Sequence, residues 1–125
     1  MILDIFLEEL SVPALGSRAQ DVAIPEAEEW EALSFGGSAS MDSCEVHLQY
    51  SEDGGSTFTN PNGSGSKIRA LHLQAGNPAQ IEFFTPFPLT GGVGRIVRFV
   101  FVNNSAIGSA KVCAWINGRR NKVVP

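Results

Sequence analysis

Two histidines and a group of glutamates are the residues best suited by type to do chemistry. His47 and His72 lie in stretches of alternating apolar and polar residues, where an imidazole could serve as a general base near neutral pH. The glutamates could supply the carboxylate pair of a glycoside hydrolase, and they are Glu26, Glu28, Glu29 and Glu31. A histidine on a strand is more often a surface residue, and glutamates after Pro25 are more often a solvated segment. We therefore expect no catalytic residue and a protein that is not an enzyme.

The sequence lacks the short motifs that mark common active sites. It has no Gly-x-Ser-x-Gly elbow, no phosphate-binding loop, and no Cys-x-x-Cys or His-x-x-x-His pair. The glycines within 91–94 precede an apolar run rather than a helix, which favours a turn over a phosphate site. Glu52 and Asp53 offer too few carboxylates for a calcium ion. We expect no cofactor and no metal.

The clearest motif is the run Ser-Glu-Asp-Gly-Gly-Ser-Thr-Phe at 51–58, which has the Ser-x-Asp-x-Gly-x-Thr-aromatic pattern of an Asp-box. In such a turn the carboxylate accepts backbone hydrogen bonds, the glycines allow positive φ, and the aromatic ring is expected to pin the turn to the core. The pattern predicts a strand that turns tightly into a return strand at 57–59. It indicates structure rather than function. The residues that carry it are Ser51, Asp53, Gly55, Thr57 and Phe58.

Alternating apolar residues predict the strands that hold this turn. The clearest runs cover 44–50, 95–102 and 110–116, and weaker ones cover 18–24, 29–35, 67–74 and 79–84. Loops are expected at 36–43, around the prolines 86 and 88, and at Asn117-Gly118. The spacing predicts an all-β protein of about seven or eight strands, an antiparallel, jelly-roll-like β-sandwich that forms a single domain over residues 1–125.

The two ends of the chain carry opposite charge. Residues 1–31 hold eight acids and one base, whereas residues 83–125 hold six bases and no acid. The ends could pair within one domain, or the acidic face of one copy could meet the basic face of another. Residues 1–10 fit a helix, an edge strand or an arm laid on a neighbour, residues 1–12 could form an arm or edge segment, and residues 119–125 form a basic tail. The protein-contact residues that we predict are Ile2, Phe6, Glu8, Glu9, Arg119, Arg120 and Lys122.

Composition disfavours several classes of protein. No apolar run approaches the roughly 18 residues that cross a bilayer, and the N-terminus lacks the basic flank of a signal peptide. A pI near 5.0, without aromatics between the basic residues, disfavours nucleic acid as a partner. Cys44 and Cys113 fit buried reduced residues better than a disulfide. Tyr50 and Trp115 are expected to face the core, which would leave few aromatics for a carbohydrate surface.

Part of the chain resembles the jelly-roll modules of carbohydrate-binding and adhesion proteins. The resemblance lies in the hairpin at 48–58, in Val-Arg-Phe-Val-Phe-Val-Asn-Asn-Ser at 97–105, and in Lys-Val-Cys-Ala-Trp-Ile at 111–116. The chain departs from that pattern at 117–120, where Asn-Gly-Arg-Arg replaces the acids that often end the last strand. The resemblance therefore does not extend to a calcium or sugar site.

In size and in its Gly-, Ser- and Asn-rich loops, the whole chain also resembles small accessory proteins of tailed-bacteriophage particles, of the head-decoration (cement) or tail type. This resemblance implies a homo-oligomeric structural protein of the virion, made in the host cytoplasm. Its partners would be its own copies and a capsid or tail assembly. The alternative is a carbohydrate-binding module or adhesin-type domain, with solvent-facing aromatics clustered on one sheet or loop rim.

Overall fold

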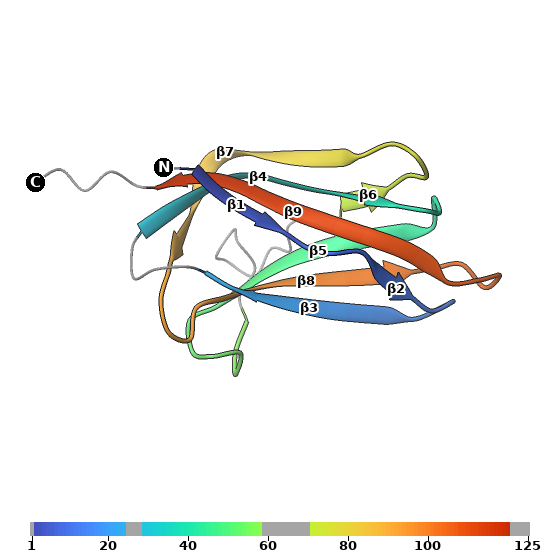
Figure 1. Cartoon of the computed structure of the whole chain (residues 1–125), viewed down its shortest axis with the longest axis horizontal. Helices are drawn as coiled ribbons and strands as arrows, with labels where there is room; N and C mark the ends of the chain where they lie inside the picture. Colours follow the sequence, from blue (N-terminus) through green and yellow to red (C-terminus); the bar gives the residue numbers. More distant parts are fainter. Residues whose placement is uncertain (1, 25–28, 59–70, 121–125) are drawn as a thin grey trace, which may run out of the picture.

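In the computed structural model, which describes residues 2–24, 29–58 and 71–120, two antiparallel sheets face each other (Figure 1). The five-stranded sheet has the order β1-β9-β4-β7, with β2 also pairing on β9, and the four-stranded sheet has the order β3-β8-β5-β6. The predicted all-β, antiparallel, jelly-roll-like sandwich is confirmed. Among these residues no helix is long and apolar enough to cross a membrane. The strands are β1 (Ile2–Phe6), β2 (Leu10–Val12), β3 (Ser17–Ala23), β4 (Glu29–Ala39), β5 (Cys44–Ser51), β6 (Leu71–Leu73), β7 (Ala79–Thr90), β8 (Ile96–Asn103) and β9 (Ala110–Arg120).

The core lies between the sheets and is filled by the inward side chains of the central strands. Along β5 and β8 buried and half-buried residues alternate, because successive side chains of a strand point to opposite faces. Phe99 and Phe101 of β8 are fully buried from one sheet, and Phe35 of β4 and Ile116 of β9 from the other. Burying each such side chain stabilises the fold by about 1.5–3 kcal/mol.

Strand β4 runs through Gly36 and Gly37, where the sequence predicts a loop. A Cβ on Gly36 would lie 2.5 Å from Cζ2 of Trp115, and a Cβ on Gly37 would lie 3.1 Å from Cδ2 of Leu73. The two glycines thus leave room for side chains that cross the strand on its two faces. The expected loop at 36–43 is wrong for its first half, because these small residues serve close packing rather than a turn.

Two other strands continue past residues that usually end them. β7 extends through Pro86 and Pro88 and is an edge strand, where a missing N–H can face solvent. β9 continues through Asn117-Gly118, because Gly118 lets the backbone of Glu31 approach more closely than a Cβ would allow. The breaks expected at both places are therefore wrong.

Residues 2–12 lie at an edge of the five-stranded sheet rather than in a helix. β1 pairs antiparallel with the end of β9, and β2 pairs with its beginning. Ile5 and Leu7 are 5% and 7% exposed and belong to the core. The acidic N-terminal segment and the basic end of β9 thus lie side by side within one chain, with Ile2 opposite Arg119.

Asn103, at the end of β8, joins three loops at one end of the sandwich. It is fully buried, and its amide nitrogen donates to the carbonyls of Val12 and Gly108, at 3.3 and 3.0 Å. Its Oδ1 accepts from the hydroxyl of Ser43 and from the N–H of Ser105, at 2.9 and 3.0 Å. One buried amide therefore fixes the loops after β2, after β4 and after β8 to one another.

Candidate functional site

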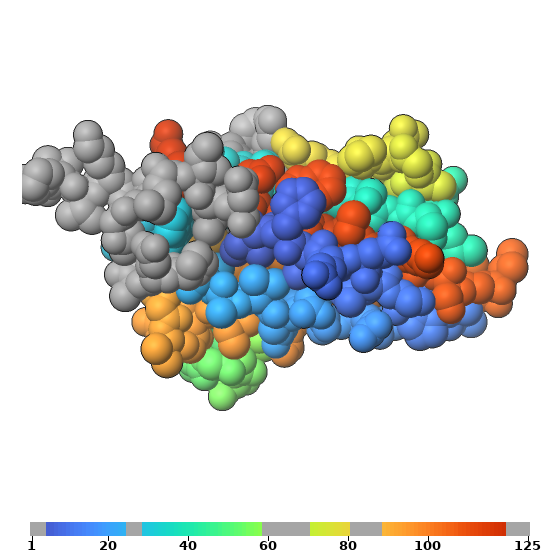
Figure 2. All heavy atoms as spheres, viewed as in Figure 1, coloured from blue at the N-terminus to red at the C-terminus, as the bar shows by residue number. Residues whose placement is uncertain are grey.

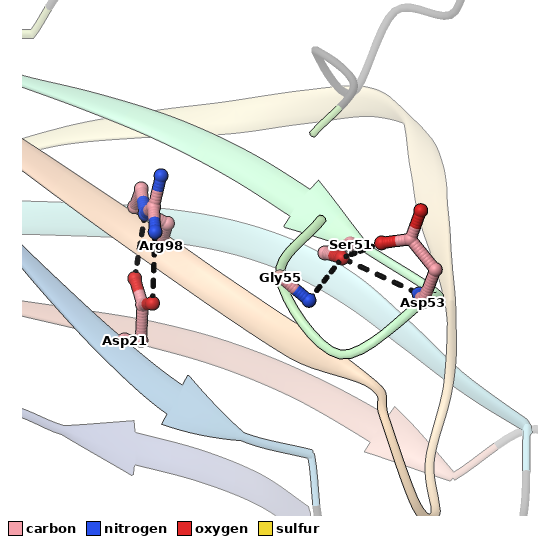
Figure 3. A network of polar contacts seen from close by, with 5 residues as sticks. All are labelled: Asp21, Ser51, Asp53, Gly55 and Arg98. Atoms are coloured by element: carbon pink, nitrogen blue, oxygen red, sulfur yellow. Dashed lines mark hydrogen bonds and ion pairs between the residues drawn. The ribbon is translucent and has the colours of Figure 1, made fainter. Parts of the chain in front are cut away.

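The loop at 51–58 is built around the side chains of Ser51 and Asp53 (Figure 3). Ser51 Oγ donates to Asp53 Oδ1 at 2.8 Å and accepts from the N–H of Gly55 at 3.0 Å. Asp53 Oδ1 also accepts from the N–H groups of Ser56 and Thr57, at 3.0 and 2.9 Å, and the Thr57 hydroxyl donates to Oδ2. Both carboxylate oxygens of Asp53 are thus used to close the loop.

These hydrogen bonds hold the pKa of Asp53 far below its ordinary value. The hydroxyl and the N–H of Thr57 have the largest effect, and the hydroxyl of Ser51 follows. Gly54 and Gly55 have φ angles of +76° and +98°, which a residue without a Cβ adopts at little cost. The carboxylate is therefore ionised near neutral pH and acts as a structural acceptor rather than as an acid.

The loop packs against the turn that precedes β8 instead of folding into a tight hairpin. Gly54 N donates to Gly94 O, and Arg95 Nη1 donates to Glu52 O, each at 2.8 Å. Residues 57–58 are not in a strand, and the strand that pairs beside β5 is β6. The return strand expected at 57–59 is wrong for its described part, because contacts between loops replace the strand ladder. Residue 59 lies outside what the structure describes.

Phe58 lies on the outer face of the four-stranded sheet rather than in the core. Its ring lies under the guanidinium of Arg98, with 3.7 Å from Cζ to the ring centroid. Arg98 also binds Asp21 of β3 through both oxygens, at 2.7 and 3.0 Å, and this contact raises the pKa of Arg98 (Figure 3). The aromatic residue of the motif thus anchors the loop through a surface cation, where the sequence predicts the core.

The two histidines lie on the outward face of the four-stranded sheet. His47 is half-buried on β5, with Nε2 3.8 Å from Glu45 Oε2, and His72 is exposed on β6 opposite the same glutamate. Two surface imidazoles beside a half-exposed acid are ordinary for a solvated sheet face. In the described part of the chain, no three His, Cys, Asp or Glu side chains are grouped so that they could hold a metal ion.

The charged ends of the chain are partly neutralised within one molecule. Arg119 Nε donates to Glu31 Oε2 at 2.9 Å, and Lys111 Nζ lies 3.9 Å from Glu9 Oε1. Arg120 is the last residue of β9. The structure thus fits the interpretation in which the oppositely charged ends pair within one domain, rather than the one in which they meet only between copies. The candidate residues that lie outside the described part are Glu26, Glu28 and Lys122.

Trp115 faces outward, where the sequence predicts it in the core. Its neighbours Ala114 and Ile116 are fully buried, so the residue between them points to the other face. Its indole lies over Gly36, its partner on β4, and stacks with Phe6, its partner on β1, with ring centroids 5.9 Å apart and planes at 20°. The alternation within 110–116 already indicates this outward direction. The inward face of the strand is formed by apolar residues without the tryptophan, namely Ala110, Val112, Ala114 and Ile116.

Tyr50 and Cys44 face the core as predicted, whereas Cys113 does not. Tyr50 is 5% exposed, and its hydroxyl donates to Thr90 O at 2.9 Å. Cys44 is fully buried, which raises its pKa, and Cys113 is half-buried on the outward face of β9, with Sγ 2.9 Å from Ser38 Oγ. Both thiols are free and they belong to different sheets.

No model of a known protein family matches the sequence, and no curated protein matches it. Among solved structures, the carbohydrate-binding module CBM36 in complex with calcium and xylotriose is similar with a TM-score of 0.41 and 12% identity, over 86% of this chain and 77% of that one. The mitogen derived from Yersinia pseudotuberculosis has a TM-score of 0.41 and 11% identity, over 100% and 90%. A chain of infectious bursal disease virus, Gx strain, has a TM-score of 0.23 and 13% identity, over 96% and 38%. These likenesses concern the β-sandwich architecture and assign no function to this chain.

Proposed function

We propose that this is a non-enzymatic structural protein that joins its own copies, or decorates a larger assembly such as a virion, through the free edge of β1. The observation that carries the proposal is an apolar edge strand, Ile2–Phe6, that has a neighbour on one side only among the described residues. In Figure 2 the dark blue residues from Ile5 onward lie at the surface near the centre of the view. An open edge of this kind is a template for a strand from another chain.

One hydrogen bond gives the direction of the backbone groups of β1. Leu7 N donates to Ala114 O at 2.9 Å, so the N–H of Leu7 faces β9. In an antiparallel pair such residues alternate, and Ile5 therefore faces β9 as well. Asp4 and Phe6 then present their N–H and C=O groups to the open side, where a partner strand would pair with them.

The other edges of the two sheets are less suited to accept a strand. β7 contains Pro86 and Pro88, which cannot donate a hydrogen bond, and the part of β6 that the structure describes is short, Leu71–Leu73. The edge strand β3 bears charged side chains at its surface. At β1, by contrast, the residues Ile2–Phe6 include no proline and one charged residue, Asp4.

The substitution Asp4→Pro tests this edge without opening the core. Proline at this position removes an N–H that faces away from β9 and leaves the ladder to β9 intact. We expect the wild-type protein to associate as its concentration rises, and Asp4→Pro to stay monomeric with an unchanged unfolding midpoint. Size-exclusion chromatography with light scattering measures both masses. Asp4→Ala keeps the N–H and is the matched control, which should associate like the wild type.

Deletion of residues 1–10 would be a poorer test, because it removes Ile5 and Leu7 from the core and uncovers β9. A wild-type protein that stays monomeric at every concentration contradicts self-association. An Asp4→Pro protein that associates as well as the wild type contradicts a role for this edge.

A further inference from the structure

We infer that the outer face of the five-stranded sheet binds neutral carbohydrate, on a platform formed by Phe6 and Trp115. The site uses side chains of the sheet face, whereas the proposed association uses the backbone edge of β1, so each can exist without the other. Three features of this face point to the ligand class: exposed aromatic surface, hydrogen-bonding side chains on both sides of it, and the placement of charge.

The aromatic surface lies in one register row that crosses the sheet. Phe6 of β1, Trp115 of β9, Gly36 of β4 and Gln80 of β7 are successive partners in this row. Trp115 has a packing role, because its indole fills the space above Gly36. Phe6 fills no such space, since it is 72% exposed while its ring is held nearly parallel to the indole. A ring ordered in water in this way is typical of a binding surface.

Small polar side chains lie on both sides of the rings. Cys113 and Asn117 are two residues from Trp115 along β9, share its face, and lie about 7 Å away along the strand. Their partners on β4 are Ser38, which is half-buried, and Ser34, which is 7% exposed and offers little of its hydroxyl to a ligand. A pyranose has an apolar C–H face and a rim of hydroxyls, so it can stack on a ring while it exchanges hydrogen bonds with the hydroxyl and amide groups beside that ring.

Charge then selects among polar ligands. The row of Trp115 contains no charged residue, and the cations at the two ends of the face, Arg119 and Lys111, are each paired with a glutamate. An acidic oligosaccharide would find these two cations already paired with carboxylates, which favours a neutral sugar. A basic peptide is the competing ligand, and the polar side chains on both sides of the rings favour the sugar over it.

Titration with cellotetraose, maltotetraose and mannotetraose, followed by two-dimensional NMR of the backbone amides, tests the site. We expect at least one of these sugars to shift the amides of Phe6 and of residues 113–117 saturably below about 10 mM, and tetragalacturonate to shift none of them. Phe6→Ser, which removes an exposed ring, should weaken binding about tenfold. Trp115→Thr should weaken it at least as much, whereas Trp115→Phe should retain most of it.

Ile107→Ser is the matched control, because it also removes a large apolar side chain, 93% exposed, but from a loop outside this row. It should bind like the wild type. The inference is overturned if no sugar of the three shifts the row, if Phe6→Ser binds as tightly as the wild type, or if tetralysine shifts the row and the sugars do not. Asp4→Pro should keep the sugar binding, so loss of association and loss of binding remain separate results.

Discussion

The indole of Trp115 lies over Gly36, its partner on the neighbouring strand, and fills the space that a side chain would otherwise take. A Cβ on Gly36 would come within 2.5 Å of Cζ2 of the indole and within 2.6 Å of the carbonyl oxygen of Ala79. The indole could swing aside, but the carbonyl belongs to the backbone of β7 and could not. Gly36 is therefore required by the close approach of the β7 backbone as well as by the indole that covers it.

We expect Gly36→Ala to lower the free energy of unfolding by about 1–3 kcal/mol, because the added methyl overlaps both the indole and the backbone of β7. Denaturation followed by circular dichroism measures the change. Gly108→Ala is the control, since a Cβ there would meet no atom within 4 Å, and its effect should stay below about 0.5 kcal/mol. Equal effects of the two substitutions would mean that the strands around Gly36 accommodate the added methyl without a loss in the free energy of unfolding.

Asn103 should be the most sensitive polar residue of the fold. Asn103→Ala leaves the carbonyls of Val12 and Gly108 without their donor inside the protein. We expect a loss of about 2–4 kcal/mol in the free energy of unfolding. Asn104→Ala removes an exposed amide from the next position and should be nearly neutral. A loss at Asn103 no larger than at Asn104 would show that the three loops hold together without it.

Leu15 combines a left-handed backbone with an exposed side chain, and replacing it with glycine should stabilise the protein. Its φ is +53° and it is 71% exposed. Leu15→Gly relieves the steric penalty of a Cβ in this region, partly offset by the greater freedom of the unfolded chain, and we expect a gain of about 0.5 kcal/mol. Ile107→Gly, at an exposed position whose φ is negative, should instead lose about 0.5–1 kcal/mol. Thermal unfolding measures both changes, and melting temperatures that shift in the same direction for the two variants would contradict this account.

The low pKa of Asp53 makes the contribution of its loop depend on pH. A carboxyl whose pKa is lower in the folded state stabilises the fold fully above its unfolded pKa and loses that effect as pH falls through the folded value. We expect the stability advantage of the wild type over Asp53→Asn to be complete above about pH 5 and to shrink below the ordinary value of 3.8.

Melting temperatures from about pH 7 down to about pH 2 measure this difference. Thr57→Val removes the hydroxyl that has the largest effect on the pKa of Asp53. We expect this variant to keep only part of the stability advantage that the wild type has over Asp53→Asn. A difference between wild type and Asp53→Asn that stays constant over the whole range would mean that the ionised carboxylate is not the acceptor that closes the loop.

The fold class could be predicted because strand alternation is a local property. In β5 and β8 the face of each side chain follows from its immediate neighbours, so Val46 and Leu48, or Phe99 and Phe101, identify the core by themselves. Glycines carry no such local information. Gly36 and Gly118 look like turn residues in the sequence, yet each lies within a strand where another element approaches closely, and that element comes from a distant part of the chain.

The contacts at the candidate sites also differ in whether the local sequence indicates them. The hydrogen bonds between Ser51, Asp53 and Thr57 span at most four residues, and the motif indicates them directly. The outward direction of Trp115 could also have been derived from its strand. Its contact with Phe6 could not, because the pairing of β1 with β9 joins the two ends of the chain and depends on the whole topology.

Cys113 lies two positions from Trp115 on the same outer face, whereas Cys44 is fully buried in the core and its pKa is raised. A maleimide dye applied to the folded protein would therefore attach to Cys113 and spare Cys44. The natural sequence thus already provides a single attachment point for a fluorescent probe beside the aromatic row, with no cysteine to be introduced and none to be removed.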